Sequence, residues 1–273
     1  MLCDTHTHLA AYSHDAKQTI DELLACAAQN NLSAVCITDH YEKDLFYNGR
    51  EDIFDLTRYF ADLTAIKATL PETAPELLIG IELGYLPHLD DFYSALTRDH
   101  PFDCVILSIH ILDGKDPYFT SDLYQAGSET VYRRYLTALI DMIHQCPDFD
   151  ILGHFDYISR YAPVSDLKMH YDHFPSEFEQ LLGFLAEHGK ALEINSRSIV
   201  RLQSGGYQDF DAWPDPMIVK RQLELGGWIS LGSDAHNPDE AGNLFTETTA
   251  WLRQLGCREV VHFVRRQPVF TKI

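Results

Sequence analysis

Short runs of apolar residues recur along the chain, and most are apolar at every position rather than at alternate ones. Runs of this kind, about four to eight residues long, are typical of parallel strands that are covered by helices. The pattern predicts a first strand that leads into His6 and His8. It predicts six more at residues 33–38, 76–83, 104–109, 150–154, 191–195 and 227–232.

Amphipathic stretches lie between these runs and predict helices. Apolar side chains follow helical spacing over residues 20–27 and again over 131–143, where Ser128 is a plausible N-cap. Ser176 followed by Glu179 resembles a capping box at the start of a third helix. Repeated alternation of strand and helix predicts an α/β fold of barrel type.

The chain shows no linker, low-complexity segment or internal repeat, so we expect one domain over residues 1–273. Its longest polar stretches are 111–127, 156–175 and 196–216, and each follows a predicted strand. The loops that follow the strands of a barrel gather at its carboxyl face, where active sites are built. The functional residues are therefore expected at the strand ends and in these loops.

The charge of the chain limits the classes of binding partner. The formal net charge is -20, from 41 acidic and 21 basic residues. An acidic surface repels phosphate backbones and anionic lipids, so we expect a small-molecule partner rather than nucleic acid or a membrane. The sequence does not indicate an oligomeric state.

The cysteines and the N-terminus favour a cytoplasmic protein. The six cysteines are scattered, without a CxxC pair, and several lie in apolar runs, as free thiols do in a reducing compartment. We find no signal peptide and no run near the ~20 apolar residues of a membrane span.

Residues able to bind metal ions stand at the ends of the predicted strands. Histidine, aspartate or glutamate occurs at all but one of these ends, where the ends of a closed barrel would converge. For one histidine alone a structural role is the better interpretation, but the set together favours a metal site. The candidate ligands are His6, His8, His14, His40, Glu82, His110, His154, Asp234 and His236.

The spacing of these residues fits a cluster of more than one ion. His6 and His8 share a face because alternate residues of a strand point the same way, and Asp234 and His236 repeat this spacing. Imidazole and carboxylate ligands suit zinc, iron or manganese, and nine ligands are too many for one ion. His14 is the weakest candidate, since it lies in a loop.

Seven short motifs, in this order, resemble those of the polymerase and histidinol phosphatase (PHP) family of metal-dependent phosphoesterases. They are "DTHTH", "ITDH", "GIELGY", "LSIH", "LGHFD", "LEINS" and "GSDAH", and they span nearly the whole chain. The stretches "SIHILDGKDPYF", "GHFDYISRY" and "LEINSRS" are similar to the stand-alone histidinol-phosphatases of that family. The resemblance implies a distorted seven-stranded (β/α) barrel of TIM-like shape.

The resemblance also implies a site with three divalent transition-metal ions. The first ion would be held by His6, His8, Glu82 and Asp234, and Glu82 would bridge to a second ion on His110 and His154. The third ion would be held by His14, His40 and His236. In this family Arg160 and Arg197 fall in the two motifs that clamp the phosphate, and a planar guanidinium suits phosphate oxygens.

The expected reaction is hydrolysis of L-histidinol phosphate to L-histidinol and phosphate. A hydroxide shared by two ions would attack the phosphorus atom, and Asp234 or His236 could protonate the leaving oxygen. Asp39 and Asp156 could orient ligand imidazoles, although a capping or salt-bridging role is equally plausible. Asp15, Glu42 and Asp113 are acids that could meet the substrate ammonium, and the sequence does not select among them.

Two alternatives remain open at the level of sequence. One is a PHP phosphoesterase that acts on another small ester, such as a nucleotide, a sugar phosphate or phosphotyrosine. The other is a metal-bound module without catalysis. The complete ligand set and the two arginines argue against the module.

Overall fold

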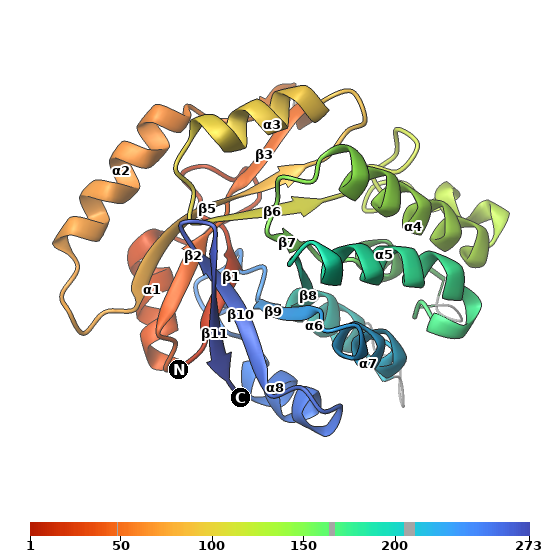
Figure 1. Cartoon of the computed structure of the whole chain (residues 1–273). Coiled ribbons are helices and arrows are strands. Elements are labelled where there is room, and N and C mark those ends of the chain that lie inside the picture. Colours follow the sequence, from red (N-terminus) through yellow and green to blue (C-terminus); the bar gives the residue numbers. More distant parts are fainter. Residues whose placement is uncertain (48, 164–166, 205–210) are drawn as a thin grey trace.

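The computed structural model describes residues 1–47, 49–163, 167–204 and 211–273, and its centre is a nearly closed barrel of parallel strands (Figure 1). Every expected strand is present, which confirms the predicted α/β barrel with seven parallel strands. Around the barrel they are β1 (Cys3–Thr7), β2 (Ala34–Ile37), β5 (Glu76–Gly84), β6 (Cys104–Ser108), β7 (Ile151–Leu152), β8 (Ala191–Asn195) and β9 (Trp228–Gly232).

The barrel closes between its first and last strands through a small set of hydrogen bonds. The amide of Asp234 donates to the carbonyl of His6 at 2.8 Å, and the amide of His8 donates to the carbonyl of Ala235 at 3.0 Å. Lower in the barrel, the Thr5 hydroxyl donates to the carbonyl of Leu231 at 2.9 Å. The two chain segments that carry candidate ligands are thus joined directly.

Eight α-helices in the described part of the chain surround the barrel (Figure 1). Their apolar faces pack on the strands, as Leu23, Leu24 and Ala27 of the first helix do. None of the helices in these residues is long and apolar enough to cross a bilayer. They are α1 (Ile20–Gln29), α2 (Leu56–Thr69), α3 (Asp90–Asp99), α4 (Ser128–Gln145), α5 (Pro175–Glu187), α6 (Ser196–Ser204), α7 (Pro216–Glu224) and α8 (Phe245–Gln254).

The helix starts differ from the sequence predictions in two places. Helix α4 contains Ser128 as its first residue, and Gly127, with φ of 89°, is the N-cap. The predicted capping box of α5 is wrong, because the helix begins at Pro175 without a side-chain cap. The Glu179 carboxylate instead accepts hydrogen bonds from Arg221 at 2.6 and 2.8 Å.

An outer hairpin at the carboxyl end of the barrel was not predicted. It consists of β3 (His40–Tyr47) and β4 (Arg50–Asp52), and β3 pairs in parallel with β5 so that His40 stands beside Glu82. The polar stretch expected at 196–216 begins instead as helix α6. Parts of the expected stretches 156–175 and 196–216 lie outside the described residues.

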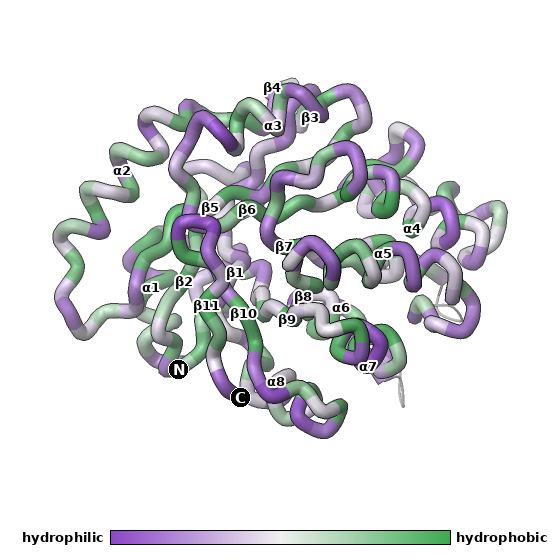
Figure 2. Tube along the Cα trace, viewed as in Figure 1, coloured by the Kyte–Doolittle hydropathy of each residue, from purple (hydrophilic) through white to green (hydrophobic). Residues whose placement is uncertain are grey.

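A second hairpin, β10 (Glu259–Val264) and β11 (Gln267–Lys272), lies across the amino end of the barrel. Its Val261 and Phe263 pack against an inner apolar cluster that includes Cys3, Cys36 and Cys104. The barrel strands β2, β5 and β6 and much of β10 are hydrophobic along the trace (Figure 2). The lower barrel is therefore filled with apolar side chains, and the polar groups lie at the carboxyl end.

Candidate active site

The carboxyl end of the barrel brings nearly all of the candidate ligands together. Each follows or ends a strand, as expected, and each of these side chains is largely buried. In four groups of three residues, the nitrogen or oxygen atoms that could bind an ion lie within 4.8 Å of one another. The groups are His6–Glu82–His154, His6–His8–Asp234, His8–His40–His236 and His40–Glu42–His110.

The carboxylate of Glu82 lies at the centre of this cluster. Its side chain is fully buried, and its two oxygens face ring nitrogens from five histidines. These nitrogens belong to His6, His8, His40, His110 and His154, at 3.3, 3.7, 2.7, 3.4 and 2.9 Å. Burial raises the pKa of Glu82, but the facing His6, His40 and His110 lower it more, so the group is a carboxylate.

The imidazoles of His6 and His8, at the carboxyl end of β1, are oriented by hydrogen bonds at Nδ1. His6 Nδ1 donates to Glu193 at 2.8 Å, which leaves Nε2 turned toward Glu82. His8 Nδ1 lies 3.3 Å from the Ser13 hydroxyl, and that hydroxyl donates to Asp39 at 2.7 Å. With Nδ1 protonated in this way, each Nε2 presents a lone pair to the cluster.

Two further imidazoles are held in the same manner. His110 Nδ1 donates to the buried carboxylate of Glu42, and its Nε2 faces Glu82. His236 Nδ1 donates to the backbone carbonyl of Asp234 at 2.8 Å. Four ligand candidates thus share one tautomer, with Nε2 free to bind an ion.

The polar atoms inside the cluster fit a set of metal ions. His6 Nε2, His8 Nε2, His40 Nδ1 and one oxygen of Glu82 are buried without a hydrogen-bond partner among the described residues. Buried polar groups without partners are costly, and imidazole nitrogens with carboxylate oxygens are the donors preferred by zinc and similar ions. The side chains present therefore suit divalent transition metals.

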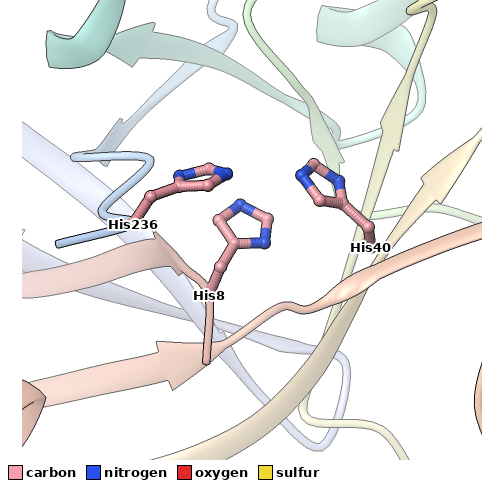
Figure 3. A group of neighbouring side chains, drawn as sticks. All are labelled: His8, His40 and His236. Carbon is pink, nitrogen blue, oxygen red and sulfur yellow. The ribbon is translucent and has the colours of Figure 1, made fainter. Parts of the chain in front are cut away.

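In one of the four groups, His8, His40 and His236 turn their rings toward one another (Figure 3). The ring centroids of His8 lie 4.2 Å from those of both His40 and His236. The carboxylate of Asp15 completes this group, with oxygens 3.1 Å from His236 Nε2 and 3.6 Å from His40 Nε2. Asp15 was considered from the sequence only as a partner for an ammonium group.

The structure places His14 outside these close groups, which differs from the expectation for a ligand. Its Nδ1 donates to Asp52 at 2.8 Å, and its ring stacks on Tyr47 at 4.2 Å between centroids. The His14 and His40 centroids are 6.4 Å apart. Asp15, the next residue, lies closer to His40 and His236, while His14 also lines the cavity over the cluster. The role of His14 as a ligand stays a prediction.

Asp234 connects the cluster to the arginines. Its backbone has φ of 55°, in the left-handed region that is uncommon for residues with a side chain and is enriched at functional sites. One carboxylate oxygen lies 3.4 Å from His8 Nε2, and the other lies 3.3 Å from an Arg160 nitrogen. The side chain thus faces imidazole and guanidinium at once.

Arg160 and Arg197 both reach the cavity over the cluster. Arg160 is buried and rigidly held, with Nε donating to Ser198 at 2.7 Å and Nη2 to Asn195 at 3.0 Å. Arg197 is more exposed and donates to the carbonyl of Asp234 at 3.1 Å. Both line a cavity of about 810 Å³ together with five of the histidines, so positive charge lies beside the cluster.

The carboxylates that support the site differ from those suggested by the sequence. Asp39 acts on His8 through Ser13, and Asp156 accepts from Ser198 and so supports Arg160 rather than an imidazole. Glu42 and Glu193 accept directly from the imidazoles of His110 and His6. Glu193 lies within the predicted strand 191–195, whereas Glu42 lies on a strand that was not predicted.

Buried imidazoles and carboxylates lie at the carboxyl end of a parallel barrel. The fold and the site therefore define an α/β-barrel protein whose side chains suit the binding of metal ions. The family model of the PHP domain matches residues 4–197. The chain therefore belongs to the PHP domain family.

Relatives along the whole chain agree with this assignment. A protein named probable histidinol-phosphatase from Clostridium acetobutylicum is 28% identical over 243 residues, covering 89% of each chain. The histidinol-phosphatase of Lactococcus lactis subsp. lactis is 27% identical over 261 residues, covering 95% of this chain and 93% of the relative. The crystal structure of histidinol phosphate phosphatase from the same organism, complexed with zinc, L-histidinol and phosphate, matches with a TM-score of 0.84 at 24% identity, covering 98% of each chain.

Proposed function

We propose that this protein is a metal-dependent phosphomonoesterase that hydrolyses L-histidinol phosphate to L-histidinol and phosphate. The observation that carries the proposal is the Glu82 carboxylate among five imidazoles, with Arg160 and Arg197 lining the same cavity. The family assignment and the names of relatives that match nearly the full chain support this substrate.

We assign the ions to three neighbouring positions. His6, His8, Glu82 and Asp234 would hold the first ion, and Glu82, His110 and His154 would hold the second. His40 and His236 would hold the third, with Asp15 as the closest further donor. The ligand types allow zinc, iron or manganese, and zinc has support from the Lactococcus lactis structure.

Divalent ions bound here would lower the pKa of a water molecule and offset negative charge on the phosphoryl group. The side chains of the protein would position the phosphate beside the ions. Arg160 is fixed by Ser198 and Asn195, so its planar guanidinium meets a phosphate without further ordering. Arg197, which is more exposed, would bring a second guanidinium to the phosphate.

Protonation of the leaving oxygen falls to Asp234 or His236. Both lie next to Arg197, and both line the cavity. His236 Nδ1 donates to the carbonyl of Asp234, so His236 could give a proton only from Nε2, in a state in which Nε2 does not bind the third ion. With Nε2 on that ion, the proton would move at the Asp234 carboxylate.

We also propose that residues 1–273 work as one domain in the cytoplasm. The strands from residue 3 to residue 232 build one barrel, and the last hairpin packs beneath it. All six cysteines are buried free thiols, which is usual for a reducing compartment.

Phosphate release from L-histidinol phosphate tests the proposal directly. Purified protein is loaded separately with zinc, manganese or iron, and its metal content is measured on the same sample. We expect turnover that a chelator abolishes and that exceeds turnover of a nucleotide, a sugar phosphate or phosphotyrosine. Full metal loading without release of phosphate from any monoester would contradict the proposal and favour a binding module.

A further inference from the structure

The mouth of the cavity carries aromatic side chains that the phosphatase chemistry does not use. Phe46, Tyr118 and Phe119 line the cavity and are 65%, 57% and 68% exposed. Large aromatic rings left in water at the rim of a polar cavity mark a surface that packs against a ligand. The end of a ligand that points away from the cluster would therefore meet aromatic side chains.

The acids that line the cavity differ in whether their oxygens are engaged. Glu42 accepts from His110 with one oxygen and from the Tyr47 hydroxyl, at 3.0 Å, with the other. Asp15 faces two imidazoles of the cluster, and Asp234 faces an imidazole and Arg160. These three acids are occupied by groups of the site itself.

Asp116 is the fourth acid of the cavity, and it is only partly engaged. Its Oδ1 accepts the backbone N–H of Tyr118 at 2.8 Å and lies 3.5 Å from the Tyr157 hydroxyl. Its Oδ2 has no hydrogen-bond partner, and no lysine or arginine forms an ion pair with it, among the described residues. Neighbouring Lys115 pairs with Asp122 at 2.9 Å instead. A half-buried carboxylate in this state suits a cation supplied by the ligand.

Asp116 lines the same cavity as five of the histidines, Arg160 and Arg197. Asp116 lies close enough to His110 and to Glu42 for their charges to act on its pKa, although burial, which raises that pKa, is the larger effect. It therefore lies near the cluster but outside it. In L-histidinol phosphate the ammonium is separated from the ester oxygen by two carbon atoms, so an acid that lines the same cavity without being a proposed ligand is a candidate partner for it.

We propose that Asp116 binds the ammonium group of the substrate, and that the aromatic rim formed by Phe46, Tyr118 and Phe119 packs against its imidazole ring. This inference rests on the proposed function, because it assigns the leaving-group end of the same substrate. It also replaces the three acids named from the sequence. Asp15 and Glu42 are engaged by imidazoles, and Asp113 pairs with Arg134 and does not line this cavity.

The test replaces Asp116 by asparagine, whose side-chain oxygen can still accept from Tyr118. For Asp116→Asn we expect kcat/KM for L-histidinol phosphate to fall about tenfold to a hundredfold, mainly through KM. The value for 3-(imidazol-4-yl)propyl phosphate, which lacks the amine, stays at the wild-type level. The matched control is Asp113→Asn, which leaves both values unchanged. An equal loss on both esters, or no loss on either, overturns the assignment.

A second pair of esters separates this inference from the choice of natural substrate. Wild-type protein should prefer 2-aminopropyl phosphate to propyl phosphate, and Asp116→Asn should remove that preference. If L-histidinol phosphate is not hydrolysed but this preference exists and is lost in the variant, the proposed substrate is wrong and the ammonium site stands. If L-histidinol phosphate is hydrolysed and the variant keeps the preference, the ammonium site is refuted and the proposed function stands.

Binding of the product tests the aromatic rim without turnover. In Phe119→Ala we expect the Kd for L-histidinol to rise about threefold to tenfold, while the Kd for 2-amino-1-propanol stays unchanged. Equal effects on both ligands would show that the rim does not contact the imidazole.

Discussion

The imidazole of His6 donates through Nδ1 to Glu193 at 2.8 Å, so that its Nε2 faces Glu82, 3.3 Å away. Glu193 also accepts the backbone N–H of His154 at 2.6 Å, which ties the ends of β1 and β7 to one carboxylate on β8. One buried acid thereby sets the direction of one proposed ligand and the backbone position of another.

Replacing Glu193 by glutamine should weaken metal binding without removing a ligand. Glutamine has one acceptor oxygen, so either the His6 N–H or the His154 N–H would face an amide NH₂. We expect the affinity for zinc to fall about tenfold to a hundredfold, measured by competition with a chromophoric chelator. Glu187→Gln, at the exposed end of α5, is the control, and an unchanged affinity in Glu193→Gln would contradict the positioning role.

Substitutions of Asp15 and His14 should have opposite effects on the binding of the third ion. The Asp15 oxygens lie 3.1 and 3.6 Å from His236 and His40, whereas His14 is bound to Asp52. We therefore expect Asp15→Asn to lose about one bound ion per chain and His14→Ala to keep the wild-type metal content, both measured by elemental analysis. The reverse result would return His14 to the ligand set that the family resemblance implies.

Arg197→Ala should weaken the binding of the phosphate group and leave the binding of metal ions unchanged. The guanidinium lies at the cavity and contacts Asp234 only through a backbone carbonyl, so its loss leaves the cluster intact. We expect kcat/KM for L-histidinol phosphate to fall about tenfold to a hundredfold with constant metal content. Arg98→Ala, on exposed α3, serves as the control, and a wild-type kcat/KM in Arg197→Ala would refute the clamp.

Gly232 leaves room for the Glu193 side chain. A Cβ at this position would lie 1.9 Å from a Glu193 oxygen and 2.7 Å from His6 Cβ. Gly232→Ala should lower the free energy of unfolding by about 1–3 kcal/mol or more, measured by urea denaturation, and should also reduce zinc affinity. Gly183→Ala is the matched control, because no atom lies within 4 Å of its added Cβ in helix α5. That variant should gain roughly 0.5–1 kcal/mol.

Removal of the ions should destabilise the protein as a whole. Without ions, one ring nitrogen each of His6, His8 and His40 and one oxygen of Glu82 lack a hydrogen-bond partner among the described residues, and ions bind the folded state in preference to the unfolded one. Zinc at about 100 times its Kd adds roughly 2.7 kcal/mol, which corresponds to a rise of about 5–10 °C in Tm for a chain of this size. Calorimetry before and after chelation measures this shift, and an unchanged Tm would argue against the centre.

The strands and the main cluster could be predicted because their signal is local. Most of the buried strands are short apolar runs with a metal-binding side chain at or near the carboxyl end, as β5 has Glu82. The outer strand β3 escaped prediction since its sequence, HYEKDLFY, is polar at most positions and buried only near its start. Glu42 was therefore not recognised as the acceptor for His110.

The conformation of loops could not be predicted from the sequence. His14 and Asp15 are neighbours, and only the path of the chain decides which side chain faces the cluster. The same holds for Glu179, which meets Arg221 across helices instead of capping its own helix. Such contacts join distant segments, so no short-range pattern records them.

The hairpin β10–β11 has a consequence for the chemistry of the thiols. Val261 and Phe263 cover an inner layer that contains Cys3, Cys36 and Cys104, each at most 6% exposed. Thiols shut away from solvent are spared oxidation to sulfenic and higher acids. Strands β10 and β11 thus shield these thiols from solvent. The resistance of the protein to thiol oxidation therefore depends on a segment at the end of the barrel opposite the active site.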